Sequence, residues 1–330
     1  MNKFPLFIVI LTICCSCKKK AELKGIDFRQ EMRIFVQEIS SYAKNKKSTF
    51  YIVPQNGQDL ITTSKKPDNT ISFNYLNAID GIGREDLYYG LEKDNALSNA
   101  KETASIKSFL DIYLKNGKVV MVTDYCKDLD KVNDSYQKNS ANGFVSFAAP
   151  DRNMTIFPST IFNKNEDSIV SLSNAKNFLY LINPEKYNSK SEFIEALKTS
   201  NYDILLLDLF VQDEELTETD ILQLQRKTNG NKRLVLCYIS IGEAENYRYY
   251  WSQKWAIKNG PIKPAAPNWL RNQNRDWKGN YKVEYWRSEW KNIIYGSSSA
   301  YMDKILNAGF DGAYLDIVDA YEYYEDILKQ

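Results

Sequence analysis

The feature that most constrains the fold is a regular alternation of short apolar runs with longer helix-like stretches. The runs are rich in Val, Ile, Leu and Tyr and seldom alternate with polar residues, which is typical of strands buried on both faces of a parallel sheet. The predicted strands are residues 49–54, 75–80, 118–124, 144–149, 178–183, 203–209, 233–240, 281–286 and 312–318. The predicted helices are residues 28–45, 103–115, 190–199, 217–227 and 298–308. Strands separated by helices indicate βαβ units.

This pattern predicts an α/β fold, a single closed (β/α)8 barrel over residues 28–330. Such barrels occupy about 250 residues as one unit, and no linker rich in Pro or Gly divides this stretch. An open doubly wound sheet is the alternative, but no G-x-G-x-x-G follows a predicted strand. The body begins with a helix and ends with a strand, whereas a standard barrel begins with a strand. Because a closed barrel has no privileged starting point, a rotated chain order can keep the same packing.

The first residues, MNKFPLFIVILTICCSCKKK, have the features of a secretion signal. A Lys precedes an apolar run over residues 4–13, which is shorter than the ~20 residues that span a bilayer. The segment resembles a bacterial lipoprotein signal, with residues 1–16 removed, Cys17 lipidated and residues 17–27 serving as a tether. An uncleaved N-terminal anchor is the alternative. Either way we expect a protein of the bacterial cell envelope, anchored to a membrane and exposed outside the cytoplasm.

The composition excludes several kinds of chemistry. The chain has no His, so it has neither a Ser-His-Asp triad nor any His-ligated metal. Its formal charge of +1 and the absence of a phosphate-binding loop argue against a nucleic-acid partner. We expect no cofactor and no metal site, and proton transfer by carboxylates, Lys, Tyr or Cys. Cys126 and Cys237 are expected to be buried free thiols, with a disulfide as the alternative.

Acidic residues recur where apolar runs end, and in a barrel the C-terminal ends of the strands carry the chemistry. These residues are Asp80, Asp124, Asp208, Glu243, Glu245, Asp316 and Asp319. Each one alone could cap a helix or pair with a basic side chain, but their concentration at one rim favours a site. Two carboxylates, one protonated and one ionised, are the equipment of glycoside hydrolysis, which needs no His.

All six Trp residues lie between residues 251 and 290. Sugars present flat C–H faces that pack on aromatic rings, so a Trp-rich segment beside an acidic rim predicts a glycan platform, with Trp286 as the favoured contact. The alternative is that this segment folds around its own aromatic core.

Long motifs carry a resemblance to a known family. They are ISIGEAENYRYYW (239–251), WLRNQNRDWKGNYKVEYWRSEW (269–290), GFDGAYLDIVDAYEYY (309–324), MRIFVQEISSYAK (32–44), FYIVPQNG (50–57) and AIDGIGREDLYYG (78–90). They resemble glycoside hydrolase family 114-like barrels, described as endo-α-1,4-polygalactosaminidases and relatives and once labelled cysteinyl-tRNA synthetase-related. The resemblance implies a TIM-type barrel in circularly permuted order, because residues 28–158 resemble the family's C-terminal half and residues 174–330 its N-terminal half.

The resemblance also implies roles for individual residues. Glu245 matches the acid of the family's G-x-x-E segment, Asp316 and Asp319 match its D-x-x-D segment, and Asp208 matches the acid that ends its second strand. Many relatives read Val-Glu-Pro-Asp where this chain reads Ala-Tyr-Leu-Asp, so Tyr314 stands where they have a candidate catalytic Glu. The family's polymer of protonated amino sugars would suit an acidic rim.

We therefore expect a glycoside hydrolase, with Asp316 and Glu245 as the working pair and Asp208 as a third candidate. The residues expected to bind the glycan are Glu243, Arg248, Tyr285, Trp286, Asp319, Asn56, Asp80, Arg84 and Asp124. A non-catalytic glycan-binding lipoprotein is the alternative, and a purely structural envelope protein is a weaker one. The sequence leaves the oligomeric state open.

Overall fold

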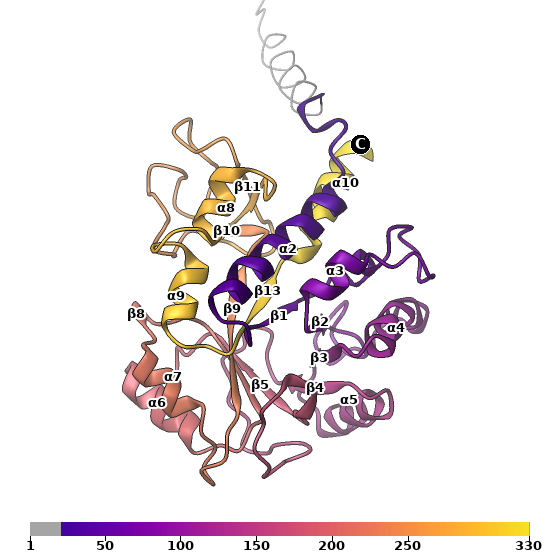
Figure 1. Cartoon of the computed structure of the whole chain (residues 1–330), viewed down its shortest axis with the longest axis vertical. Coiled ribbons are helices and arrows are strands. Elements are labelled where there is room, and N and C mark those ends of the chain that lie inside the picture. The colour runs from indigo at the N-terminus through magenta and orange to yellow at the C-terminus, as the bar shows by residue number, and fades with distance from the viewer. Residues whose placement is uncertain (1–20, 330) are drawn as a thin grey trace, which may run out of the picture.

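Eight parallel strands form the centre of the computed structural model, which describes residues 21–329 (Figure 1). The strands are β1 (Tyr51–Pro54), β2 (Gly81–Glu85), β3 (Val119–Tyr125), β4 (Val145–Ala149), β5 (Phe178–Leu181), β6 (Ile204–Leu207), β9 (Leu234–Ser240) and β13 (Gly312–Asp316). The predicted signal peptide, residues 1–16, and Cys17 lie outside the described residues. The mixed α/β class with parallel strands is confirmed.

The parallel strands are hydrogen-bonded in two groups. One sheet has the order β1-β13-β9-β6-β5 and the other the order β2-β3-β4. A single parallel bridge, between Gln55 and Gly83, joins β1 to β2. At the other side β4 and β5 are neighbours whose rings Phe147 and Phe178 pack at 5.8 Å, but no ladder joins them in the described part of the chain. A continuous closed barrel therefore stays a prediction.

Helices follow most of the strands. They are α2 (Phe28–Lys46), α3 (Phe73–Ala78), α4 (Ala100–Lys115), α5 (Leu129–Ala141), α6 (Lys190–Lys198), α7 (Glu218–Leu224), α8 (Ser288–Ile294), α9 (Tyr301–Asn307) and α10 (Tyr321–Lys329), with short 3-10 turns η1 (Gln58–Ile61), η2 (Leu172–Asn174) and η3 (Val318–Ala320). All five predicted helices are confirmed with small shifts at their ends. Helix α2 shows why: Asp27 caps its first turn, and Met32, Phe35 and Ile39 recur on one buried face.

One predicted strand is wrong, and another forms in part but lies outside the parallel strands. Residues 75–80 are mostly helix α3, and the strand at this point is β2, whose sequence GIGRE is too poor in apolar residues to be seen as a strand. Residues 281–286 contribute to β12 (Asn280–Val283), which lies in a separate antiparallel sheet with β10 (Glu243–Glu245) and β11 (Leu270–Gln273). This small sheet follows β9, and a hairpin of β7 (Phe210–Val211) and β8 (Glu214–Glu215) follows β6.

The two ends of the described chain meet. Helices α2 and α10 lie side by side in Figure 1, and the rings of Phe28 and Tyr324 stack with centroids 5.3 Å apart. The guanidinium of Arg29 pairs with Glu325 at 2.8 Å. The first helix therefore packs directly against the last.

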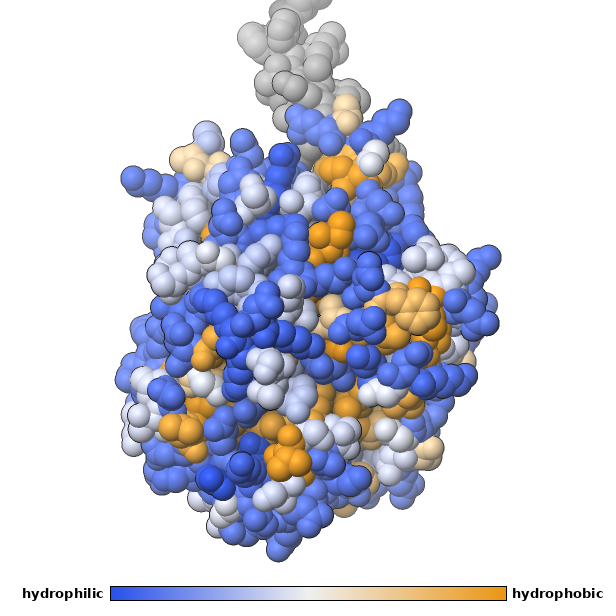
Figure 2. All heavy atoms as spheres, viewed as in Figure 1, coloured by the Kyte–Doolittle hydropathy of each residue, from blue (hydrophilic) through white to orange (hydrophobic). Residues whose placement is uncertain are grey.

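On the face seen in Figure 2, hydrophilic residues predominate and hydrophobic ones form separate patches. None of the helices within residues 21–329 combines the length and the apolar character needed to cross a membrane. Cys126 and Cys237 are free and buried, as expected, and burial raises the pKa of the Cys126 thiol to about 12.

Candidate active site

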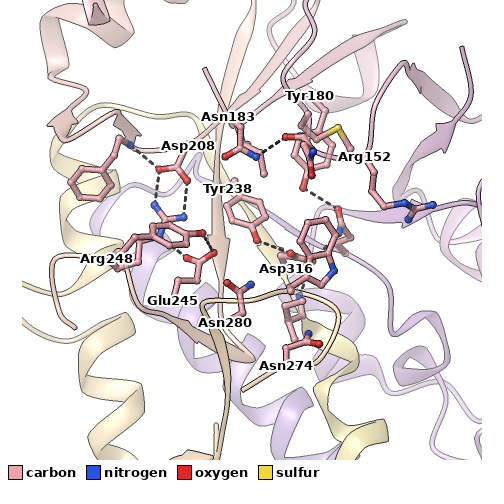
Figure 3. A pocket seen from close by; sticks show the side chains of 18 of the residues that line it. Arg152, Tyr180, Asn183, Asp208, Tyr238, Glu245, Arg248, Asn274, Asn280 and Asp316 are labelled. Carbon is pink, nitrogen blue, oxygen red and sulfur yellow. Dashed lines mark hydrogen bonds and ion pairs between the residues drawn. The ribbon is translucent and has the colours of Figure 1, made fainter. Parts of the chain in front are cut away.

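A cavity of about 900 Å³ lies at the C-terminal ends of the parallel strands (Figure 3). It brings together the three carboxylates predicted to be catalytic: Asp208 after β6, Glu245 in β10 and Asp316 at the end of β13. Asp208 and Asp316 converge because parallel strands place all their C-terminal ends at one edge, and Glu245 joins them from β10, the short antiparallel strand that follows β9.

Asp316 lies at the bottom of this cavity and is 9% exposed. Its Oδ1 accepts hydrogen bonds from the Gln55 side-chain amide at 2.7 Å and from the backbone N–H of Ile317 at 2.8 Å. Its Oδ2 accepts one from the Tyr238 hydroxyl at 2.7 Å. Burial raises the pKa of Asp316 well above its ordinary value, and the charge of nearby Glu85 raises it further.

Glu85, which ends β2, is the second carboxylate of this wall. It accepts hydrogen bonds from the Tyr125 hydroxyl and, at 3.3 Å, from the side-chain amide of Asn56. Burial raises the pKa of Glu85 as well. All the hydrogen-bond donors that reach Asp316 and Glu85 within the described chain are neutral, so no cation cancels either charge by direct contact.

The connection between these carboxylates is strand β1, which lies between β13 and β2. Gln55 and Asn56 are consecutive at its end, and each donates to one of the two acids.

The backbone beyond Asp316 is strained, because Ile317 has a left-handed φ of 59°, which is rare for a β-branched residue. Strain of this kind persists where the surrounding structure fixes it, often at functional sites.

The opposite wall holds the other two predicted acids in one ion-pair cluster. Arg248 donates to both oxygens of Asp208, at 2.8 and 2.7 Å, and its Nε pairs with Glu245. The Tyr247 hydroxyl donates to the remaining Glu245 oxygen at 2.6 Å. One buried guanidinium thus compensates both carboxylates, a geometry that Lys does not reproduce.

Three residues predicted to bind the glycan also line the cavity: Asn56, Arg248 and Asp319. Burial raises the pKa of Asp319 to about 6, and the charge of Glu322 adds to this.

Asp80 and Asp124 lie away from the cavity, for different reasons. Asp80 precedes β2 instead of ending a strand, and it accepts the Ile52 N–H at 2.8 Å and pairs with Lys44 at 2.9 Å. Asp124 is fully buried and accepts hydrogen bonds from Tyr88, Tyr89, Ser135 and Asn139. Successive strand residues face opposite sides, so Tyr125 reaches the cavity and Asp124 does not.

Four further residues that were predicted to contact the glycan do not line the cavity. The Tyr285 hydroxyl donates to the carbonyl of Phe28 at 2.7 Å, and Trp286 packs on Tyr324 at 4.7 Å, because this segment covers helices α2 and α10. Glu243 is fully buried against Lys282 and Asn274. Arg84 pairs with Asp86 at 2.9 Å and donates to the Asn56 side chain at 3.3 Å.

The sequence analysis missed several residues of the site. They are Gln55, Glu85, Tyr125, Arg152, Tyr180, Asn183 and Tyr238. Glu85 was not predicted because β2 lacks the apolar pattern of a buried strand. The glycines of β2 nevertheless indicate a position where another part of the chain packs closely. A Cβ on Gly83 would lie 1.9 Å from the hydroxyl of Tyr314, so that glycine makes room for the Tyr314 side chain.

No group of three or more Cys, Asp or Glu residues between positions 21 and 329 is arranged to hold a metal ion.

Comparison with known proteins places this site in a family context. The chain is 34% identical over 164 residues to an uncharacterized protein of Methanocaldococcus jannaschii, covering 49% of this chain and 43% of that protein. It is 34% identical over 133 residues to an uncharacterized protein of Deinococcus radiodurans, covering 40% and 38%, and 31% identical over 128 residues to one of Thermotoga maritima, covering 39% and 36%. The chain thus spans about two fifths of the length of these curated relatives. The family model described as glycoside-hydrolase family GH114 matches residues 163–329, half of the chain, which therefore belongs to this family.

Proposed function

We propose that this protein cleaves a glycosidic bond of a substrate held in the cavity, with Asp316 and Glu85 as the two catalytic carboxylates. The observation that carries the proposal is the pair itself: two carboxylates in one cavity, each with a raised pKa and neutral hydrogen-bond partners. The charge of Glu85 raises the pKa of Asp316, which favours a proton on one member of the pair and so an acid and a base together. Family membership supports a glycoside hydrolase in general.

The hydrogen bonds suggest which acid carries the proton. Although burial raises the pKa of Asp316 well above its ordinary value, three donors surround Asp316 and two reach Glu85, so the hydrogen bonds favour the ionised form at Asp316. Glu85 then protonates the glycosidic oxygen as the bond breaks. Asp316 attacks the anomeric carbon or takes the proton of an attacking water.

The charge of the cavity supports a cationic substrate. Eight carboxylates line it against three basic side chains, namely Glu85, Glu185, Asp208, Asp213, Glu245, Asp276, Asp316 and Asp319 against Arg152, Arg248 and Lys278. Such an excess attracts protonated amino sugars. We therefore propose an amino-sugar polymer such as polygalactosamine, with neutral glycans as the alternative.

The role of Glu245 separates this proposal from the sequence-based one, in which Glu245 pairs with Asp316. That assignment stays a prediction, but Glu245 is held in an ion pair with Arg248, whereas the donors that reach Glu85 are neutral. We propose that Glu245 and Asp208 shape the wall of the cavity that binds the glycan.

The test of this assignment compares the turnover of Glu85→Gln with that of Glu245→Gln. Turnover should fall by orders of magnitude in the first and more modestly in the second, and the reverse ranking would restore the sequence-based pair.

A non-catalytic glycan-binding protein is the second candidate. Release of reducing ends from galactosamine-containing and other glycans should be measured for the wild type and for Asp316→Asn. A hydrolase loses turnover in this variant while it still binds glycan. Wild-type protein that binds glycans but releases no reducing ends from any of them would favour the binding protein.

The closed barrel and the rotated chain order are proposed as well. The contact between α2 and α10 supports the rotation.

Envelope location through lipidated Cys17 is a further proposal, and it rests on the sequence alone. Labelling with a fatty-acid analogue should mark the wild type and not Cys17→Ser. Equal labelling of both would exclude Cys17 as the modified residue.

A further inference from the structure

One Trp differs from the other five in its surroundings. Trp277 lies in the turn between β11 and β12, lines the cavity and is 46% exposed. The remaining five pack with other aromatic rings, for example Trp269 on Trp290 at 5.0 Å and Trp251 on Trp255 at 5.3 Å. Packing in an aromatic core therefore explains the positions of these five Trp residues, but it does not explain the exposed position of Trp277.

The turn that carries Trp277 is held in place. At its base, the Asn274 N–H donates to the Asn280 carbonyl at 2.7 Å, and the Asn274 side chain donates to buried Glu243 at 2.9 Å. The Asn246 N–H donates to the carbonyl of Gly279 at 2.9 Å. These bonds fix the turn beside the segment that bears Tyr247, so little ordering entropy remains to be lost on binding.

Tyr247 presents a second fixed ring at the same cavity. Its hydroxyl is bound to Glu245, and the guanidinium of Arg248 lies 4.9 Å from its ring centroid. The residue is nevertheless 65% exposed. A large aromatic ring anchored at its polar end but left open to water presents apolar surface that a ligand can cover.

We infer that Trp277 and Tyr247 form a sugar-binding subsite at the mouth of the cavity, distinct from the subsites beside Asp316 and Glu85. This inference rests on the proposed function and extends it. Asp316 is 9% exposed at the bottom of the cavity, whereas Trp277 and Tyr247 are at its open side. A subsite there holds sugar units remote from the bond that breaks. The substrate is therefore a chain of several sugars, and the carboxylate of Asp276 beside Trp277 favours amino sugars.

The test uses Trp277→Ala with α-1,4-linked galactosamine oligosaccharides of two lengths, a disaccharide and an octasaccharide. The ratio kcat/KM should fall about tenfold on the octasaccharide and stay unchanged on the disaccharide, since only the longer chain reaches the mouth. Trp277→Tyr, which keeps a stacking ring, should recover most of the loss. Phe73→Ala, which removes an aromatic ring 60% exposed on α3 and outside the cavity, is the matched control and should change neither value. Equal loss on both substrates, or none on the octasaccharide, would overturn the subsite.

A binding measurement separates this inference from the proposed function. Calorimetry in the Asp316→Asn background should show about tenfold weaker octasaccharide binding when Trp277→Ala is added. That result supports the subsite even if the wild type hydrolyses nothing, in which case only the hydrolase proposal fails. The subsite is contradicted if adding Trp277→Ala leaves octasaccharide binding unchanged, or if the Asp316→Asn protein binds no octasaccharide. Either result holds whether or not the wild type hydrolyses the glycan.

Discussion

The hydroxyl of Tyr238 donates to Oδ2 of Asp316 at 2.7 Å, across the adjacent strands β9 and β13. Both side chains are buried at the bottom of the cavity, so this bond forms with little competition from water. Tyr238 is a positioning residue, because it fixes the carboxylate and stabilises its ionised form.

Tyr238→Phe should therefore raise the pKa of Asp316. The acidic limb of kcat/KM should move to higher pH by about one unit, since a hydrogen bond to a charged group contributes about 1.5–3 kcal/mol. Tyr180→Phe is the control, because that hydroxyl reaches only Gln55, at 3.4 Å. A pH profile measured on one glycan for both variants checks this, and an unmoved limb in Tyr238→Phe would show that the bond is not coupled to the reaction.

Arg248 should contribute strongly to stability. Arg248→Met leaves Asp208 and Glu245 buried beside each other without a cation, and removal of one partner from a buried ion pair costs about 3–5 kcal/mol. Urea unfolding at neutral pH measures this loss. Lys304→Met, at a partly exposed pair with Glu215, should have little effect. Similar losses in the two variants would contradict the role of Arg248.

Asp319 should make the protein more stable in mild acid than at neutral pH. Its pKa is raised from 3.8 to about 6, so the native state binds this proton more tightly than the unfolded state does. That contribution is complete below the unfolded pKa and is lost as the pH rises through about 6. Asp319→Asn should raise the free energy of unfolding at neutral pH by on the order of 1 kcal/mol, because Asp319 is partly exposed, and leave it nearly unchanged in acid. Denaturant unfolding at both pH values tests this, and a variant that is no more stable at neutral pH would refute it.

The rotated chain order can be tested by reversing it. A short flexible linker would join the end of α10 to Phe28, and the chain would be opened between Ser159 and Thr160, which are both exposed. Because α2 and α10 already touch, this variant should fold and keep the circular dichroism and glycan turnover of the parent. A matched variant opened within β9 should not fold, since that strand is buried along its whole length. Failure of the first variant would count against the permuted barrel.

The sequence by itself determined the strands that are apolar enough to be buried on both faces. Runs such as those of β6 and β9 have no other stable environment, and their repetition fixed the α/β class. The topology of parallel strands then required acids such as Asp208 and Asp316 to gather at one edge. The motif resemblance was sufficient to indicate the family.

Tertiary structure alone decided which acids are paired with cations and which are not. Glu245 and Asp316 look alike in sequence, but Arg248 compensates the first and neutral donors surround the second. Glu85 follows a strand without an apolar pattern, and only the position of β2 beside β1 brings it to the same cavity. The physical reason is that hydropathy records whether a segment is buried, while the charge state of a carboxylate depends on neighbours that the chain brings together from distant positions.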